Sequence, residues 1–172
     1  AEGYSPDFLI NRDRLKNLKG VSINTLKVET DFPKIPDQEI LIDALFGSGL
    51  SKPIDGLASK LVQHLNKQNT LRIAIDMPSG IYADKSSDNK NAVRFQADYT
   101  LSFQFPKLAF FMPENDAYVG NWELLDIGLS QDYIQKAETP YFLLESITAK
   151  ELIRPRAKFS HKGSFGHGLF IA

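Results

Sequence analysis

The sequence predicts an α/β protein with a mostly parallel sheet, and three features of the chain support this prediction. Residues 40–43 and 73–76 are short apolar runs that end in Asp43 and Asp76, each followed by a loop of small residues. Neither run alternates with polar residues, which is typical of strands buried on both faces. Residues 55–67 between them have the apolar spacing of a helix, so this unit is predicted to be a β-α-β crossover.

This crossover places the two aspartates at one edge of the sheet. Such connections are right-handed, and strands that follow one another in the chain are usually neighbours. We therefore expect both carboxylates to open into one crevice beyond the carboxyl ends of the strands, with Ser79 beside Asp43. Open α/β sheets bind their ligands in this crevice.

Local signals predict the other elements of the first half. A serine followed by a proline starts a helix over residues 6–18, and Gly20 ends it. Residues 21–28 form a candidate strand, and residues 31–37, which contain two prolines, form a connection. In the crossover helix, one apolar stripe contains Leu57, Leu61, Val62 and Leu65.

The sequence of the second half of the chain predicts a loop, further strands and a domain boundary. Residues 81–91 are polar and predict a surface loop, and residues 97–103 predict a third strand. We also expect a helical turn at 106–111, a fourth strand at 122–127, a short amphipathic helix at 131–136 and an edge strand at 141–144. Residues 154–167 are rich in basic residues and glycine, so we expect one domain over residues 1–153. Residues 154–172 would then be a linker and the first strand of another domain.

Composition disfavours several classes of function. A length of 172 residues with 42% hydrophobic residues fits a single domain. The net charge of -1 and the scattered basic residues disfavour nucleic-acid binding. The absence of cysteine excludes disulfides and thiolate catalysis within this chain. No stretch approaches the roughly 20 apolar residues that span a bilayer, so we expect a cytoplasmic protein without a membrane partner.

Three parts of the chain allow two interpretations each. The glycines of residues 47–53 either let backbone N–H groups approach an anion near a helix N-terminus or form a tight strand-to-helix turn. Asp43 either caps this turn or binds a hard cation through oxygen. Residues 161–166 either hold a phosphate or form a solvated turn between domains.

Asp76 is the better candidate for acid/base chemistry. Pro78 and Gly80 fix the backbone after it, and Ser79 adds a hydroxyl group, although an Asx-type turn would need the same residues. Ser79 lacks a surrounding Gly-x-Ser-x-Gly pattern, so a nucleophile-elbow hydrolase is not indicated. The three phenylalanines around Lys107 either stack on a flat ligand or belong to the core, and Lys107 itself receives no role.

Five segments of the chain follow the order of one known family. They are IDALFGSGL at 42–50, IDMPSG at 75–80, ADYTLSF at 97–103, the Pro106-Lys107 step and residues 120–128. Together they closely resemble the NAD(P)H-hydrate epimerase (YjeF N-terminal) domain, from about residue 5 to residue 134. The tail HKGSFGHGL at 161–169 is similar to the opening of the ADP-dependent NAD(P)H-hydrate dehydratase domain, whose fold is ribokinase-like. This succession is that of a bifunctional nicotinamide-nucleotide repair enzyme.

The resemblance implies a Rossmann-like three-layer α/β/α fold that interconverts the R and S epimers of hydrated NADH and NADPH. By motif matching, Asp43 and Ser79 would bind a potassium ion, and Asp76 would be the catalytic residue in contact with the hydrated nicotinamide. The substrate's phosphates would be held by Gly47, Ser48, Gly49, Leu50, Ser51, Lys52 and Pro53. The parent protein would also dehydrate the S epimer with ADP or ATP, and we expect it to be a homo-oligomer.

One departure from the family pattern leads to a further expectation. The family's Asn-Asn-Gly-Gly-Asp-Gly segment, which completes the phosphate and potassium sites, has no counterpart in this sequence and should precede residue 5. We therefore expect an N-terminally truncated epimerase domain that is inactive by itself. Two alternatives remain open: a non-catalytic ligand-binding or dimerisation module, as in an mRNA-decapping scaffold, or the scaffold of a carbohydrate-kinase-like enzyme.

Overall fold

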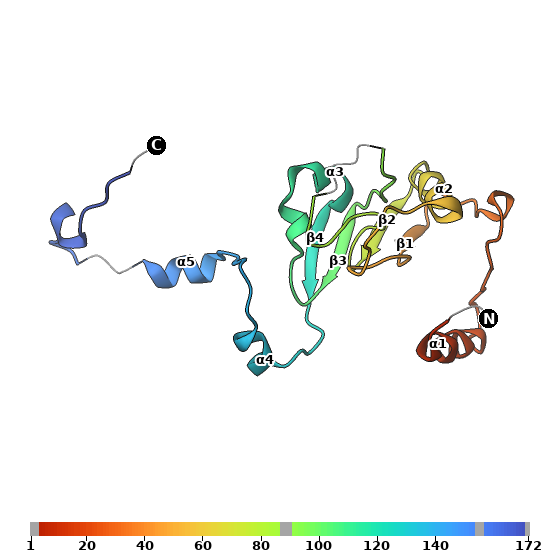
Figure 1. The fold of residues 1–172 in the computed structure, drawn as a ribbon, viewed down its shortest axis with the longest axis horizontal. Coiled ribbons are helices and arrows are strands. Elements are labelled where there is room, and N and C mark those ends of the chain that lie inside the picture. The colour runs from red at the N-terminus through yellow and green to blue at the C-terminus, as the bar shows by residue number, and fades with distance from the viewer. Residues whose placement is uncertain (1–3, 87–90, 154–156, 171–172) are drawn as a thin grey trace. The chain divides into compact units, whose positions relative to one another are not determined.

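The structure, a computed structural model, describes residues 4–86, 91–153 and 157–170 and contains one parallel sheet. The chain divides into two compact units, Ala1–Leu129 and Ser130–Ala172. The sheet lies in the first unit and consists, in spatial order, of β1 (Ile40–Asp43), β2 (Leu71–Ile75), β3 (Tyr99–Phe103) and β4 (Asn121–Leu125) (Figure 1). All three strand pairings are parallel, which confirms the predicted α/β class.

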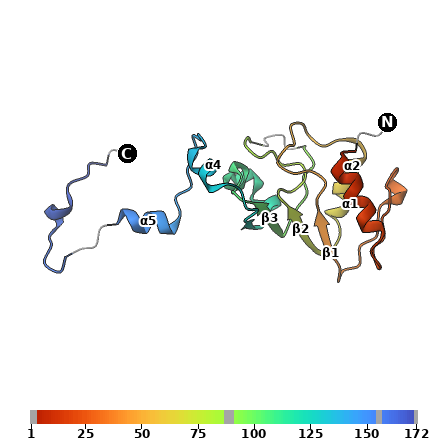
Figure 2. The ribbon, with the colours of Figure 1, turned by 90° about the horizontal axis from the view of Figure 1, so that it is seen from below.

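The predicted crossover is confirmed and forms the first part of the core. Helix α2 (Gly56–Leu65) connects β1 to β2, and its buried side chains are Val62 and Leu65. These pack in one cluster with Leu41, Ile54, Ala74, Phe95 and Ala97. The helix therefore covers one face of the β1–β2 pair, whose strands are seen from below in Figure 2. Burying such apolar side chains is the main source of stability for a unit of this kind.

The second part of the core lies under the connection between β3 and β4. This connection contains the short helices η2 (Leu108–Phe111), η3 (Pro113–Asn115) and α3 (Asp116–Val119). The buried side chains of the cluster are Met77, Ile81, Ala109 and Val119. The helical turn predicted at 106–111 is confirmed, and so are the third and fourth strands. In the loop predicted at 81–91, Ile81 is buried, and residues 87–90 lie outside the described part of the chain.

Neither aspartate run is fully buried on both faces, and β1 departs most from that prediction. In β1, Leu41 and Asp43 are buried, but Ile40 and Ile42 are 58% and 61% exposed. The reason is that β1 ends the row of described strands and α2 packs against only one of its faces. An uninterrupted apolar run therefore did not mean burial on both sides.

The strand predicted at residues 21–28 is also wrong. This stretch has no regular structure and leads to the short helix η1 (Glu29–Asp31), because no neighbouring strand supplies it with ladder hydrogen bonds. The helix predicted at 6–18 is confirmed as α1 (Pro6–Lys16), and the Ser5 hydroxyl oxygen accepts a hydrogen bond from the Phe8 N–H at its start. None of its residues is buried.

The unit Ser130–Ala172 contains α4 (Gln131–Lys136), α5 (Ser146–Leu152) and η4 (Lys162–Phe165). Helix α4 confirms the predicted short helix, whereas α5 was not predicted. The strand predicted at 141–144 is wrong, because these residues pair with no other strand. The first strand of another domain, expected within residues 154–172, stays a prediction; the described residues 157–170 form no strand, and 154–156 and 171–172 lie outside the description. Among the described residues, no helix combines the length and the apolar character needed to cross a membrane.

The turn at Gly120 provides a test of how tightly α3 is joined to β3. Gly120 has φ 60°, and a Cβ atom there would lie 2.4 Å from the Asp98 carbonyl oxygen. Gly120→Ala should therefore lower the free energy of unfolding by about 3 kcal/mol, through backbone strain and a steric clash. Gly128→Ala is the matched control, because Gly128 has φ 74° and open space around it, so about 1 kcal/mol is expected. Urea unfolding of both variants measures the difference, and equal losses would contradict the packing described here.

Candidate active site

Asp43 and Asp76 lie at the same edge of the sheet, as predicted. Asp43 is the last residue of β1, and Asp76 directly follows the last residue of β2. The two strands are parallel neighbours with Asp43 in register with Ala74, so both side chains stand at the carboxyl ends. The loops after these ends supply the other candidate residues.

Ser79 contacts Asp43 directly and joins the two loops. Asp43 Oδ1 accepts hydrogen bonds from the Ser79 hydroxyl at 2.7 Å and from the Leu45 N–H at 3.2 Å. Asp43 Oδ2 accepts one from the Ser79 N–H at 2.8 Å. The Ser79 hydroxyl oxygen in turn accepts one from the Phe46 N–H at 3.1 Å. Burial raises the pKa of the Asp43 carboxyl above its usual value, although the hydrogen bonds from Ser79 and Leu45 act in the opposite direction.

The Asp43–Ser79 pair has the chemistry of a partial site for a hard cation. A carboxylate oxygen and a hydroxyl oxygen each have two acceptor positions. After the hydrogen bonds above, Asp43 Oδ2 and Ser79 Oγ each retain one position. Hard cations bind several oxygen atoms, and no cluster of three or more acidic or histidine side chains in the described ranges could hold a metal. The pair therefore offers two oxygen positions to a hard cation.

Asp76 adopts a strained backbone conformation. Its φ is 65°, which is rare for a residue with a side chain, and the Met77 N–H donates to the Ile75 carbonyl across it at 2.8 Å. This is a γ-turn with a positive φ at its centre. The Asp76 N–H donates to the Leu101 carbonyl of β3 at 2.8 Å, which holds the turn in place. Strain of this kind costs about 1–3 kcal/mol and gathers at functional sites.

The Asp76 carboxylate has a partner on each oxygen. Oδ2 accepts a hydrogen bond from the Ser48 N–H at 3.1 Å, and Oδ1 lies 3.1 Å from Lys107 Nζ. Burial by itself would raise the pKa of Asp76, but the Lys107 ammonium and the Ser48 N–H outweigh it and hold the pKa below its usual value. The carboxylate is therefore the resting form near neutral pH.

Gly47 allows this approach of the loop to Asp76. A Cβ atom at position 47 would lie 3.1 Å from Asp76 Oδ2, tighter than ordinary van der Waals contact. This is the close backbone approach for which glycine is suited.

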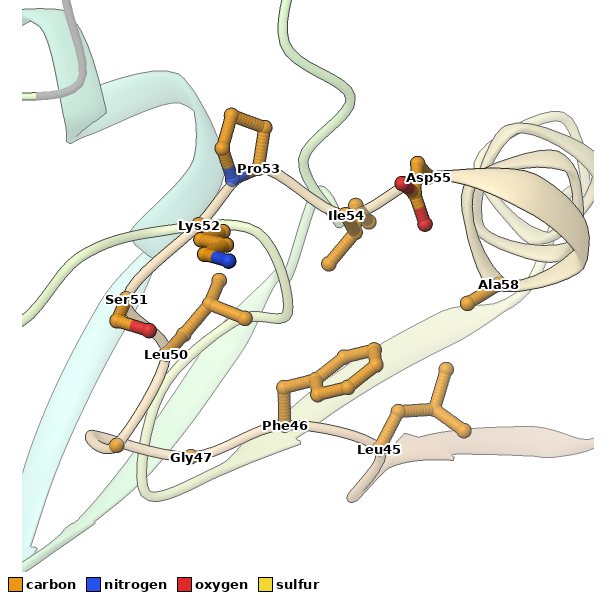
Figure 3. Close-up of a pocket in the computed structure, with 11 residues that line it drawn as sticks. Leu45, Phe46, Gly47, Leu50, Ser51, Lys52, Pro53, Ile54, Asp55 and Ala58 are labelled. Carbon is orange, nitrogen blue, oxygen red and sulfur yellow. The ribbon is translucent and has the colours of Figure 1, made fainter.

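The predicted substrate loop lines a cavity of about 450 Å³. Its lining includes Gly47, Gly49, Leu50, Ser51, Lys52 and Pro53, and it extends to the first turn of α2 at Asp55 and Ala58. Figure 3 shows the side chains of Phe46, Leu50 and Ile54 around this open pocket. A helix N-terminus attracts anions, and Lys52 adds a positive charge, whereas the Asp55 carboxylate opposes it.

The structure thus brings most of the predicted residues together, in two adjoining places. Asp43, Ser48, Asp76 and Ser79 do not line the cavity. Ser48 lies between the lining residues Gly47 and Gly49 and connects the two places through the hydrogen bond from its N–H to Asp76. Sequence reasoning left Lys107 without a role. A lysine four residues after the end of a strand next to the Asp76 strand was the available signal.

The three phenylalanines near Lys107, interpreted either as core residues or as residues that stack on a flat ligand, differ in their burial. Phe110 packs against the second core cluster and lies 5.8 Å from Trp122 between ring centroids, which favours a structural role. Phe105 and Phe111 are 45% and 49% exposed.

Comparison with known proteins gives consistent matches. Residues 2–109 match the family described as YjeF-related protein N-terminus. The bifunctional NAD(P)H-hydrate repair enzyme Nnr of Thermofilum pendens is 36% identical over 140 residues, covering 78% of this chain and 24% of that protein. The NAD(P)H-hydrate epimerase of Elusimicrobium minutum is 33% identical over 129 residues, covering 71% of this chain and 57% of that protein. The chain spans about a quarter of the length of the bifunctional relatives it matches first.

The two buried serines of this region allow a matched test of the Asp43–Ser79 contact. Ser79→Ala removes a hydroxyl that donates to Asp43 and accepts from Phe46, so the free energy of unfolding should fall by about 2 kcal/mol. Ser102 is equally buried, but its hydroxyl has no hydrogen-bond partner among the described residues, so Ser102→Ala should be neutral or slightly stabilising. Thermal or urea unfolding compares the two. A similar loss in both variants would mean that the Ser79 contacts contribute nothing specific.

Proposed function

This chain belongs to the YjeF-related protein N-terminus family, and we propose that it interconverts the R and S epimers of hydrated NADH and NADPH. The epimerase names of its relatives support this substrate class. The observation that carries the proposal is the Asp76 carboxylate, held in a strained turn beside the glycine loop by Ser48 and Lys107. In this proposal, Asp76 is the group that exchanges a proton with the substrate.

Epimerisation at a carbon that bears a hydroxyl group needs a proton to be moved but no oxidant. The C–O bond breaks on one face of the ring and forms again on the other. The departing hydroxyl gains a proton, and the returning water loses one, so the same proton can serve both steps. The resting Asp76 carboxylate first takes up a proton from water. The protonated form then donates this proton as the C–O bond breaks, and the carboxylate accepts a proton back as water adds.

The loop after β1 positions the rest of the substrate in this proposal. Its backbone N–H groups and the N-terminus of α2 suit phosphate oxygens, and Lys52 adds a positive charge at the cavity. The Ser48 N–H contacts Asp76 directly, so the loop that holds the phosphates also sets the position of the carboxylate. One segment of chain thereby orients both the phosphates and the group that reacts with the hydrated nicotinamide ring.

Potassium and a second activity are further parts of the proposal. Asp43 and Ser79 would hold the potassium ion, which would supply positive charge between the loops after β1 and β2. The names of the bifunctional NAD(P)H-hydrate repair enzymes support a second repair activity in the full-length protein. We propose that this activity is dehydration of the S epimer with ADP or ATP. A homo-oligomeric assembly stays a prediction.

The central test is Asp76→Asn in the full-length protein. The amide keeps the shape of the side chain but cannot exchange the proton, so the epimerisation rate should fall about 10²- to 10⁴-fold. ADP-dependent dehydration of the S epimer should be unchanged. Chromatographic separation of the two epimers after incubation with the R epimer measures the first activity.

Asp13→Asn is the control for this test. Asp13 is an exposed aspartate on α1 that pairs with Lys16, so epimerisation should stay at the wild-type rate. Near-normal epimerisation by Asp76→Asn would remove Asp76 from the mechanism. A wild-type protein that leaves the R epimer unchanged would favour the non-catalytic alternative.

Binding of potassium should show as stabilisation that depends on Asp43. A ligand that binds only the folded protein raises the free energy of unfolding by about 1 kcal/mol at a concentration near five times its Kd. Replacing choline chloride with potassium chloride at equal ionic strength should therefore raise the unfolding midpoint of the wild type but not that of Asp43→Asn. Equal shifts in both proteins would show that the effect is not binding at Asp43.

A further inference from the structure

Lys107 lies between the two turns that end β2 and β3. Its Nζ atom lies 3.1 Å from Asp76 Oδ1, 3.0 Å from the Phe103 carbonyl oxygen and 3.2 Å from the Phe105 carbonyl oxygen. A lysine ammonium has three N–H donors, so these three oxygen atoms account for all of them. The side chains of Lys107 and Asp76 are only 17% and 14% exposed, which limits competition from water.

The turn that Lys107 contacts is strained in the same way as the Asp76 turn. Gln104 has φ 59°, and the Phe105 N–H donates across it to the Phe103 carbonyl at 2.7 Å. The two carbonyl groups that Lys107 contacts therefore lie on either side of Gln104. Gln104 also forms hydrogen bonds through its N–H and its side-chain oxygen to the backbone at and just after the end of β4. The ammonium thus rests on backbone that β3 and β4 hold in place.

We propose that Lys107 is a positioning residue that fixes the Asp76 carboxylate beside the substrate loop by tying it to the β3 turn. The inference rests on the proposed role of Asp76 and adds a second residue to it. Since its three N–H groups are already used, Lys107 acts through Asp76 and does not contact the substrate. A strained aspartate with only the Ser48 N–H as a partner would be free to turn its second oxygen away.

Besides holding the Asp76 carboxylate in place, the Lys107 ammonium lowers its pKa. Lys107 is the charged side chain that contacts Asp76 in the described part of the chain. Its removal would leave burial and the Ser48 N–H as the remaining influences on the Asp76 pKa, so that pKa would rise.

The first experiment is Lys107→Met in the full-length protein, assayed for epimerisation. A displaced carboxylate should lower kcat about 10²-fold. KM should change by less than about threefold, because no substrate contact is lost. The limb of the pH profile that reports Asp76 should move upward by about one pH unit or more, whichever protonation state is active. Lys60→Met removes an exposed ion pair with Glu29 and should leave all three quantities unchanged.

Lys107→Arg keeps the charge and serves as the second variant, including the case in which Lys107→Met does not fold. A planar guanidinium cannot match the three oxygen atoms around Nζ, so kcat should again fall while KM stays constant. The pH limb should stay close to that of the wild type, because the positive charge remains. This pattern separates the orientation of the carboxylate from its ionisation.

Three results would overturn the proposal. Wild-type kcat and pH profile in Lys107→Met would show that Asp76 does not depend on Lys107. A raised KM with unchanged kcat would show that Lys107 contacts the substrate. The third test follows the titration of the Asp76 carboxyl by NMR after selective ¹³C labelling of aspartate carboxyl groups, with Asp76→Asn for assignment. The same Asp76 titration with and without Lys107 would overturn the proposal. This titration needs no enzymatic activity, so it distinguishes failure of the inference from failure of the proposed function.

Discussion

The buried hydrogen bonds between Asp43 and Ser79 are the interaction on which the candidate site depends. They join the loop after β1 to the loop after β2 through both carboxylate oxygens, and the Ser79 hydroxyl extends the connection to the Phe46 N–H. A buried carboxylate is unfavourable unless it is hydrogen-bonded. While Asp43 is charged, it therefore needs the hydrogen bonds from Ser79, and these hold the two loops together. The glycine loop begins directly after Phe46, and its place relative to β2 follows from this connection.

A second constraint acts on the reacting side of the site. The backbone at Asp76 is strained, and such a conformation persists only where its surroundings determine it. Here these surroundings are the Leu101 carbonyl, the Ser48 N–H and the Lys107 ammonium, each from a different part of the chain. The carboxylate is therefore oriented before a substrate arrives, which lowers the cost of reaching a reactive arrangement.

Local patterns in the chain predicted helices more reliably than strands. Helix α1 was predicted from its serine cap and proline, and α2 from its apolar stripe, because capping and periodicity are local properties. Residues 21–28 and 141–144 have strand-like composition but form no strand, because a strand also needs a partner with which to pair. The apolar run of β1 was interpreted as buried on both faces, although burial depends on which elements pack against the sheet.

The sequence by itself determined that the two aspartate strands are neighbours, that their crossover is parallel, and that Asp43, Asp76 and Ser79 meet at one edge. These follow from local periodicity and from the fixed handedness of β-α-β connections. Only the tertiary structure decided that Lys107 pairs with Asp76, that Gly47 gives the loop room beside it, and that Asp76 occupies a strained turn. The physical reason is that these contacts join residues 28 to 31 positions apart, and their geometry depends on how β1, β2 and β3 align.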